Sequence, residues 1–209
     1  MGTFNDFWIK LKKKVVGKEV IILGQRSTGK TTLLNYLATA EIPLDAKQTS
    51  SVERIQKKKN KKLKQLGWKV RLAHTQKDYG GVTGDYTAWL SGIETADIMI
   101  YLFKIDEWLL TPEKVEAQLD KDLVNIKNGL ANKAIPVFII GTHFDLYESV
   151  FGNSDSERRK LIDEIKGEGF IKSMKAVLDN DVRTTHILIG STKTKTHMEE
   201  IVTQMADWI

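Results

Sequence analysis

Four short apolar runs, each bounded by polar or turn-forming residues, recur along the chain. They cover residues 19–23, 98–103, 137–140 and 186–189. Continuous apolar runs of this length are typical of strands that are buried on both faces of a parallel sheet. Segments with helical periodicity lie between them. This alternation predicts an α/β fold with a doubly wound, mostly parallel sheet of about six strands flanked by helices.

The helical segments carry recognisable start signals and one-sided apolar patterns. Thr111 is a suitable N-cap residue, and Pro112 stands at the first helical position after it. In the last segment Ile201, Val202 and Met205 fall on one helical face. The predicted helices lie within residues 29–40, 111–130, 154–169 and 198–209.

A Lys-rich segment interrupts the regular order. Residues 52–75 show a period of two at both ends, which predicts an extended basic hairpin between strands 2 and 3. From Arg54 to Lys77 the chain has no Asp or Glu. The cluster Lys57–Lys64 could bind phospholipid headgroups, nucleic acid or an acidic protein, or could be a solvated hairpin tip. No aromatic platform accompanies it, so we do not expect nucleic acid to be a partner.

Composition narrows the class of protein. The chain has 209 residues, a formal net charge of +5 and no cysteine, which excludes disulfides, cysteine zinc sites and thiol nucleophiles. No apolar run approaches the roughly 20 residues that span a bilayer. We expect a cytoplasmic protein with one compact domain at residues 18–209, preceded by an N-terminal arm at residues 1–17.

This arm is amphipathic. Its apolar residues fall on one helical face, and the lysines between them in the sequence add positive charge. Residues 3–16 could therefore lie on an anionic membrane or dock on the chain's own domain. Gly2 is placed as in an acylation motif, but Asp6 stands where that motif requires Ser or Thr, and we do not predict lipidation. Localisation is therefore expected to be cytoplasmic, with peripheral membrane contact as the alternative.

The strongest chemical signal follows the first predicted strand directly. Residues 24–31 read GQRSTGKT, the G-x-x-x-x-G-K-T pattern of a phosphate-binding loop, and a helix-forming run comes next. The glycines let successive backbone N–H groups face phosphate oxygens, and the helix N-terminus adds a favourable dipole. We therefore expect a P-loop NTPase. The loop's candidate nucleotide-binding residues are Gln25, Arg26, Ser27, Thr28, Gly29, Lys30, Thr31 and Thr32.

Two residues of this loop have specific roles to perform. Lys30 would neutralise the β- and γ-phosphates of a bound nucleotide. Thr31 would supply a hydroxyl ligand to Mg²⁺, which prefers oxygen ligands and keeps several of its waters. Neither residue distinguishes adenine from guanine.

A second group of residues indicates which nucleotide base is bound. After the strand at residues 137–140 the chain reads GTHFDL, which resembles the G-N-K-x-D-L element of GTPases, with Asp145 at the specificity position. A carboxylate there can accept hydrogen bonds from guanine N1–H and from its 2-amino group, and adenine lacks this pair of donors. Thr142 and His143 replace the usual Asn and Lys. Ser191, Thr192 and Lys193 resemble the S-A-K element that flanks guanine.

Together these motifs resemble the Ras-like small GTPases, with the ADP-ribosylation factor family as the nearest resemblance and a G-T-H-x-D element like that of Roc domains. The chain begins MGTFNDFW, has KE before the first strand, and reads DYGG at residues 78–81. The resemblance implies that Asp78 holds a magnesium-bound water and that Gly81 offers its N–H to the γ-phosphate. It also implies a switch threonine that ligates Mg²⁺, for which we choose Thr49. GTP or GDP and Mg²⁺ are the implied cofactors.

Two departures bear on catalysis. The family's water-positioning glutamine is replaced by Val82, which cannot orient a water by hydrogen bonding, so we expect slow intrinsic hydrolysis. Arg26 stands at the third position of the loop, where it could act as an arginine finger in cis, block the attacking water or point to solvent. The candidate catalytic residues are Lys30, Thr49, Gly81 and Arg26.

The leading hypothesis is a GTP-dependent molecular switch with slow or partner-assisted hydrolysis, which acts on protein effectors and regulators that the sequence does not identify. The alternative is a nucleotide-binding interaction module that has lost hydrolysis. A P-loop kinase is a third possibility, but it has no reason to carry Asp145 together with Ser191 and Lys193.

Overall fold

A computed structural model describes residues 18–39, 69–72, 86–131, 133–146, 155–179 and 185–209. Within these residues the chain folds as a five-stranded, all-parallel sheet in the order β2-β1-β3-β4-β5. The strands are β1 (Glu19–Gly24), β2 (Lys69–Leu72), β3 (Ile98–Lys104), β4 (Val137–Thr142) and β5 (Thr185–Ile189).

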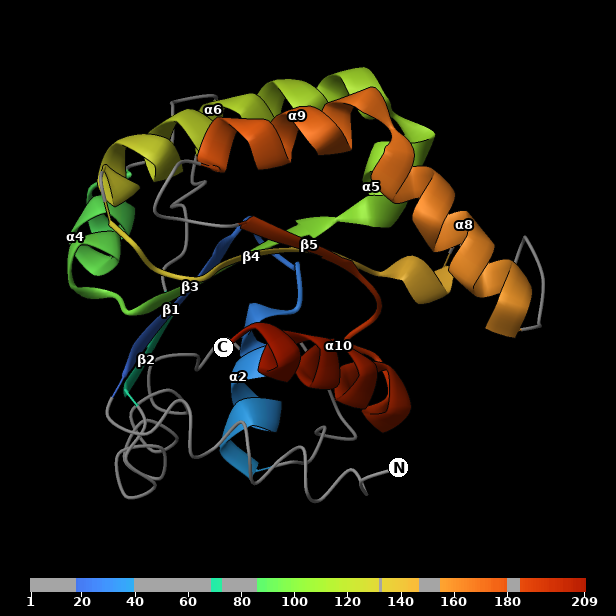
Figure 1. Cartoon of the computed structure of the whole chain (residues 1–209), viewed down its shortest axis with the longest axis horizontal. Helices are drawn as coiled ribbons and strands as arrows, with labels where there is room; N and C mark the ends of the chain where they lie inside the picture. Colours follow the sequence, from blue (N-terminus) through green and yellow to red (C-terminus); the bar gives the residue numbers. More distant parts are fainter. Residues whose placement is uncertain (1–17, 40–68, 73–85, 132, 147–154, 180–184) are drawn as a thin grey trace.

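Helices cover both faces of this sheet (Figure 1). α2 and α10 lie on one face, and α4, α5, α6 and α9 lie on the other, with α8 leading into α9. The helices are α2 (Lys30–Thr39), α4 (Thr87–Thr95), α5 (Ile105–Leu110), α6 (Pro112–Leu130), α8 (Asp155–Gly167), α9 (Gly169–Leu178) and α10 (Lys195–Trp208). The predicted α/β class with helices flanking a parallel sheet is therefore confirmed.

Alternation along the central strands sends side chains into two cores. Ile22 and Ile100 pack with α2 and α10, whereas Ile21 and Met99 pack with α4, α6 and α9. All four of these side chains are buried. This double burial is the reason that the strands read as unbroken apolar runs instead of alternating ones.

The strand order reverses at β1, because the chain passes from β1 to β2 on one side and then returns past β1 to β3 on the other, with α2 and α4 on opposite faces of the sheet. In open α/β sheets, ligands bind outside the carboxyl ends of the strands at such a switch point. The loop that follows Gly24 begins there. The fold thus places the predicted phosphate loop where a ligand site is expected.

Most of the predicted elements agree with the structure, and the differences have local causes. α4, α5 and α9 were not predicted, because their helical patterns are short. Thr111 stands at the N-cap of α6, but its hydroxyl makes no capping bond and donates instead to the carbonyl of Glu107 at 3.0 Å. The predicted N-cap position of Thr111 and first helical position of Pro112 are confirmed, while the hydroxyl of Thr111 bonds to the preceding helix, α5, which ends there.

The parts of the chain that carry the predicted hairpin and arm are mostly not described. Of the basic segment, only Lys69–Leu72 is described, and it pairs in parallel with β1 at an edge of the described sheet. The arm at residues 1–17 lies outside the described residues, so its separation from a domain at residues 18–209 stays a prediction. Among the described residues, no helix is long and apolar enough to cross a membrane.

One lysine fixes the end of α4 against the α6–β4 connection. The Nζ atom of Lys133 donates to the carbonyls of Ile93 at 2.8 Å, Glu94 at 2.5 Å and Ala96 at 3.0 Å. These are carbonyls at a helix C-terminus, where a positive charge is favourable. Lys133 therefore holds the C-terminal end of α4.

Candidate functional site

The loop after β1 curls back on itself, and three of its residues have positive φ angles. These are Gly24 (132°), Ser27 (61°) and Gly29 (85°). A Cβ atom at Gly24 would come within 2.2 Å of the carbonyl oxygen of Leu102 on β3. The backbone conformation and this close approach both require glycine at position 24. Such a succession of turns lets backbone N–H groups converge on an anion.

Lys30 lies inside this curl. Its Nζ atom donates to the carbonyl of Gly24 at 2.6 Å and to that of Gln25, and the hydroxyl of Thr28 is 3.5 Å away. Only 3% of the residue is exposed. Burial lowers the pKa of Lys30 to about 8, although the charge of Asp122 acts in the opposite direction. The ammonium group is thus held close to the loop by neutral oxygens. A bound phosphate would supply a negative charge beside it and so stabilise the protonated form of Lys30.

A threonine ties the phosphate loop to the loop after β4, which the sequence predicts to recognise the base. The hydroxyl of Thr142, at the end of β4, is 3.1 Å from the carbonyl of Thr28 and 3.0 Å from that of Phe103, and the residue is fully buried. The hydroxyl of Thr28 in turn donates to the carbonyl of Gln25 at 2.9 Å. Thr142 therefore makes the connection between loops for which GTPases use asparagine.

The predicted base-recognition residues come together around Asp145. Ser191 donates its hydroxyl hydrogen to one carboxylate oxygen of Asp145, and Lys193 Nζ is 3.2 Å from the other. Burial alone would raise the pKa of Asp145, but these hydrogen bonds and the charge of Lys193 outweigh it and lower the pKa. The Asp145 side chain is 11% exposed and that of Lys193 is 67% exposed. Asp145 is therefore held as a carboxylate, and the lysine paired with it is mostly exposed to solvent.

Backbone hydrogen bonds join the loops after β4 and β5. Phe144 donates its N–H to Gly190 at 3.1 Å, and Gly190 donates to Gly141 at 2.9 Å. His143 has a φ of 64°, a left-handed conformation that histidine adopts more readily than most residues. Its Nδ1 atom is 2.9 Å from the hydroxyl of Thr142. The loops after β4 and β5 are thus joined to each other by backbone hydrogen bonds beside the phosphate loop.

Thr192 completes the contact between the two halves of the site. A Cβ atom at Gly29 would come within 2.5 Å of the Thr192 hydroxyl oxygen, so the S-T-K loop packs directly on the phosphate loop. Gly29 must therefore be glycine for reasons of space as well as conformation. The structure brings the predicted phosphate and base residues into one site at the carboxyl edge of the sheet.

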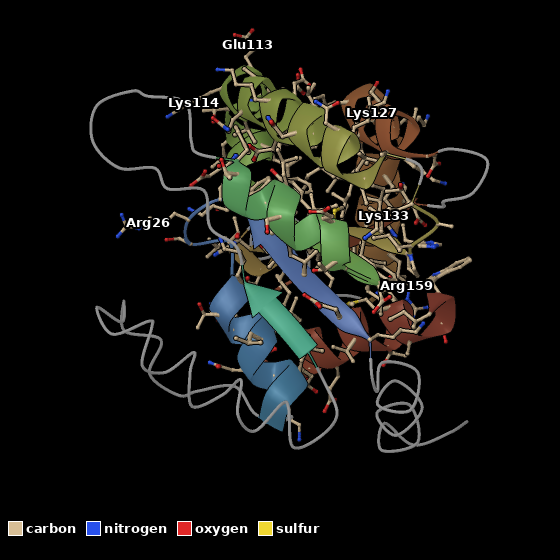
Figure 2. The ribbon with its side chains drawn as sticks, turned by 90° about the vertical axis from the view of Figure 1, so that its left-hand side faces the viewer. Arg26, Glu113, Lys114, Lys127, Lys133 and Arg159 are labelled. Atoms are coloured by element: carbon tan, nitrogen blue, oxygen red, sulfur yellow. The ribbon has the colours of Figure 1, made fainter. Side chains whose placement is uncertain are left out.

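The remaining predicted residues are more peripheral or lie outside the described part. Thr31 and Thr32 are partly exposed in the first turn of α2. Arg26 is exposed, and its side chain extends away from the fold (Figure 2). Thr49, Asp78 and Gly81 lie outside the described residues, so their roles stay predictions.

Sequence reasoning missed a buried polar cluster beneath the phosphate loop. Asp122 of α6 accepts hydrogen bonds from Tyr101 at 2.6 Å and from Tyr86 at 2.8 Å. The signal in the sequence is a single carboxylate within the apolar stripe that Leu119, Leu123 and Ile126 form on α6. A charged residue at a core-facing position requires partners, and here they are two tyrosines and Gln118.

The fold and the phosphate loop define a P-loop nucleotide-binding domain. The sequence model of the Ras family matches residues 19–207, which is nearly the whole chain. The chain therefore belongs to the Ras family of small GTPases, and the predicted resemblance is confirmed. A search of curated proteins gave no match.

Solved structures with low sequence identity have a similar fold. One is an ADP-ribosylation factor-like GTP-binding protein, the small COPII coat GTPase SAR1 from Encephalitozoon cuniculi, in complex with GDP. Its TM-score is 0.56 at 13% identity, over 98% of this chain and 87% of that one. This similarity supports the predicted Arf-like fold.

Two further structures, both in complexes with GDP, are larger proteins. SsGBP matches with a TM-score of 0.49 at 14% identity, over 91% of this chain and 49% of its own. A GTP-binding protein from the hyperthermophilic archaeon Sulfolobus solfataricus matches with a TM-score of 0.47 at 13% identity, over 98% of this chain and 57% of its own. The present chain thus spans about half the length of these two proteins.

The tie made by Thr142 predicts a measurable loss of stability. Thr142→Val keeps the shape of the side chain but removes the donor for the carbonyls of Thr28 and Phe103. We expect the free energy of unfolding in urea to fall by about 1–3 kcal/mol. Thr142→Ser keeps the hydroxyl and loses only a methyl group, so it should be less destabilising. A valine variant as stable as the unmodified chain would contradict the tie.

Proposed function

We propose that this chain binds GTP and GDP at the site described above and acts as a molecular switch with slow or partner-assisted GTP hydrolysis. Its membership of the Ras family supports this proposal. The observation that carries it is the convergence of Lys30 and Asp145 on one edge of the sheet, joined through the bond between Thr142 and Thr28. The proposed phosphate ligand and the proposed guanine acceptor thus lie on the same edge of the sheet, in loops that are joined by a hydrogen bond.

The phosphates would bind over the loop between Gly24 and Thr31. Lys30 is already aligned by the carbonyls of Gly24 and Gln25, so little side-chain entropy remains to be lost when it meets a phosphate. The N-terminus of α2 follows directly and favours negative charge. These features support binding of a di- or triphosphate group.

Magnesium fits this donor set as an ion shared with the phosphates. The described residues contain no group of three or more His, Asp or Glu that could hold a metal alone. Thr31 offers a hydroxyl at the start of α2, and the sequence adds Asp78 and, with GTP, Thr49 as proposed ligands. When bound, the ion neutralises charge on the β- and γ-phosphates.

The base would be read by Asp145. Ser191 holds one of its oxygens in place, and Lys193 occupies the other from the solvent side. Because Lys193 is exposed, it can move from the carboxylate plane to flank a purine, which leaves Asp145 to accept from guanine N1–H and the 2-amino group. Thr192 and His143 would border the same pocket. Adenine does not offer these two donors, so its nucleotides should bind far more weakly.

Substitution of Asp145 tests the proposal that this residue recognises guanine. Asp145→Asn replaces a carboxylate oxygen by an amide NH₂, which cannot accept from guanine but can donate to the 2-oxo group of xanthine. We expect GDP affinity, measured by calorimetry, to fall by roughly 100-fold or more, and xanthosine diphosphate to bind better than it does to the unmodified chain.

The matched control is Asp163→Asn, which makes the same chemical change on the exposed side of α8. It should leave the affinity for GDP unchanged. If Asp145→Asn also leaves GDP affinity unchanged, the base does not contact Asp145 and the assignment fails.

Slow hydrolysis follows from Val82, which stands where the family places its water-orienting glutamine. Val82→Gln should raise the single-turnover rate of GTP hydrolysis by at least roughly tenfold, the size expected when a group is added that orients the water by hydrogen bonding. An isosteric Val82→Thr control should give a smaller increase or none.

Arg26 provides the complementary comparison. Because the Arg26 side chain is exposed, Arg26→Ala should leave GDP affinity nearly unchanged. Any fall in the rate of GTP hydrolysis in this variant would show that Arg26 acts as an arginine finger in cis. If the unmodified chain hydrolyses GTP as fast as relatives that carry glutamine, slow turnover is disproved. If neither it nor Val82→Gln hydrolyses GTP at all, the chain is a nucleotide-binding interaction module.

The proposed switch requires partners that read its nucleotide state. We propose a protein effector and regulators, and peripheral membrane contact through residues 3–16 as an additional property. A binding assay with anionic vesicles would test the latter, with a variant in which Phe7 and Trp8 are replaced by alanine as the comparison.

A further inference from the structure

Three polar groups meet around the hydroxyl oxygen of Thr142, at the end of β4. The carbonyl oxygens of Thr28 and Phe103 lie 3.1 Å and 3.0 Å from it, and Nδ1 of His143 lies 2.9 Å from it. Thr142 is fully buried, so bulk water does not compete for these bonds. The distribution of hydrogens among the four atoms therefore follows from the chemistry of the groups themselves.

The number of available hydrogens limits how these groups can bond. A hydroxyl carries one hydrogen, and a carbonyl oxygen can only accept. If the Thr142 hydroxyl donated to Nδ1 of His143, its oxygen would face two carbonyl oxygens at short range with no hydrogen between them. Buried acceptors in that position are costly. If Nδ1 carries a hydrogen and donates it to Thr142, the hydroxyl hydrogen stays available to the carbonyls. The second arrangement is therefore favoured.

The backbone brings these two consecutive side chains together. In a strand, neighbouring side chains point to opposite faces, so a contact between them requires the chain to turn. β4 ends at Thr142, and His143 has a φ of 64°. The N–H of Leu146 donates to the carbonyl of His143 at 3.1 Å and closes the turn. His143 is therefore held against Thr142 by the backbone as well as by its side chain.

The other ring nitrogen of His143, Nε2, is the one that a ligand can reach. The residue is partly exposed, while its Nδ1 atom is occupied by the buried Thr142. Asp145, the proposed guanine acceptor, follows two residues later in the same loop. In a neutral ring with its hydrogen on Nδ1, Nε2 has a lone pair and can only accept a hydrogen bond. A lysine, which GTPases usually carry at this position, can only donate.

We propose that Thr142 is a positioning residue that holds His143 in the neutral tautomer with its hydrogen on Nδ1, so that Nε2 is presented to a bound nucleotide as an acceptor. The identity of the ligand rests on the proposed function, whereas the tautomer is a property of the ligand-free chain. The matching group on the ligand is a hydrogen-bond donor of the nucleoside. Because Asp145 would use guanine N1–H and one amino hydrogen, the remaining donors are the second amino hydrogen and the ribose hydroxyls.

Nitrogen NMR reads the tautomer directly. The full chain is labelled with ¹⁵N-histidine, and two-bond ¹H–¹⁵N spectra are recorded at pH 8, where ordinary histidines are neutral. The chain has four histidines, and the signals of His143 are assigned by their loss in His143→Asn. We expect the frequency of a hydrogen-bearing nitrogen for Nδ1 and of a lone-pair nitrogen for Nε2. A hydrogen on Nε2, on both nitrogens, or exchanging between them would overturn the proposal.

Substitution of Thr142 tests whether its hydroxyl sets the tautomer. In Thr142→Val the two ring nitrogens of His143 should move to intermediate or reversed frequencies, and Thr142→Ser should restore the frequencies of the unmodified chain. A merely structural Thr142 would affect stability and leave the tautomer unchanged, and this result in Thr142→Val would overturn the proposal. The spectrum of the unmodified chain decides the tautomer even if Thr142→Val does not fold.

The matched control is Thr185→Val, the same substitution at a fully buried threonine on the neighbouring strand β5. Its hydroxyl oxygen has no hydrogen-bond partner among the residues that the structure describes. This variant should keep the frequencies of both His143 ring nitrogens. A change in this control as large as that in Thr142→Val would mean that the tautomer does not depend on the Thr142 hydroxyl, and would overturn the proposal.

Nucleotides test what Nε2 accepts from. Saturating GDP should move the Nε2 frequency toward that of a hydrogen-bearing nitrogen, because the lone pair then accepts a hydrogen bond. 2′,3′-Dideoxyguanosine diphosphate lacks the ribose hydroxyls, and inosine diphosphate lacks the amino group. The movement should disappear with one of the two, which names the donor, and for the dideoxy analogue the affinity should then fall about 3- to 10-fold. A movement that survives in both, or none with GDP, overturns the ligand contact.

A failure of nucleotide binding is distinguishable from a failure of the tautomer. If calorimetry shows that the unmodified chain does not bind GDP, the proposed function fails and the ligand contact fails with it. The ligand-free spectra of the unmodified chain, Thr142→Val and Thr142→Ser still decide whether Thr142 sets the tautomer of His143.

Discussion

The rest of the site depends on one constraint, which is that the ammonium group of Lys30 is enclosed by the carbonyls of its own loop. This enclosure requires Gly24 at the end of β1, because any side chain there would collide with the carbonyl of Leu102. It lowers the pKa of Lys30 to about 8, chiefly through burial. A buried ammonium group without a paired negative charge is costly for the stability of the fold, and a bound phosphate would supply that charge.

The loops around this lysine are arranged by the parallel sheet. β1, β4 and β5 all point their carboxyl ends to the same edge, so the phosphate loop, Asp145 and Ser191 meet although they are far apart in the sequence. Thr142 then locks the first two of these loops together from a fully buried position. The familiar GTPase asparagine is thus replaced by a smaller side chain that keeps the hydrogen bond to the phosphate loop.

The strands and the phosphate loop could be predicted because their signals are local. An apolar run predicts β1, and G-x-x-x-x-G-K-T predicts the curl that follows it. The contacts of Asp145 with Ser191 and Lys193 depend on tertiary structure, so the sequence could name these residues but not their pairing. Asp122 was missed because only the fold brings Tyr86 and Tyr101 to it. Thr111 was assigned its correct position, but its hydrogen bond could not be predicted, because the acceptor belongs to an unpredicted helix.

The most direct test of the central claim measures whether Lys30 takes up a proton when a nucleotide binds. Burial lowers the pKa of Lys30 to about 8, so part of the Lys30 side chains are neutral at pH 8 in the free protein, and a bound phosphate would raise this pKa. Calorimetric titration with GDP and excess Mg²⁺, in two buffers that differ in ionisation enthalpy, should therefore show an uptake of protons that is larger at pH 8 than at pH 7. GDP binding with heats that do not depend on the buffer at either pH would contradict a phosphate site built on Lys30.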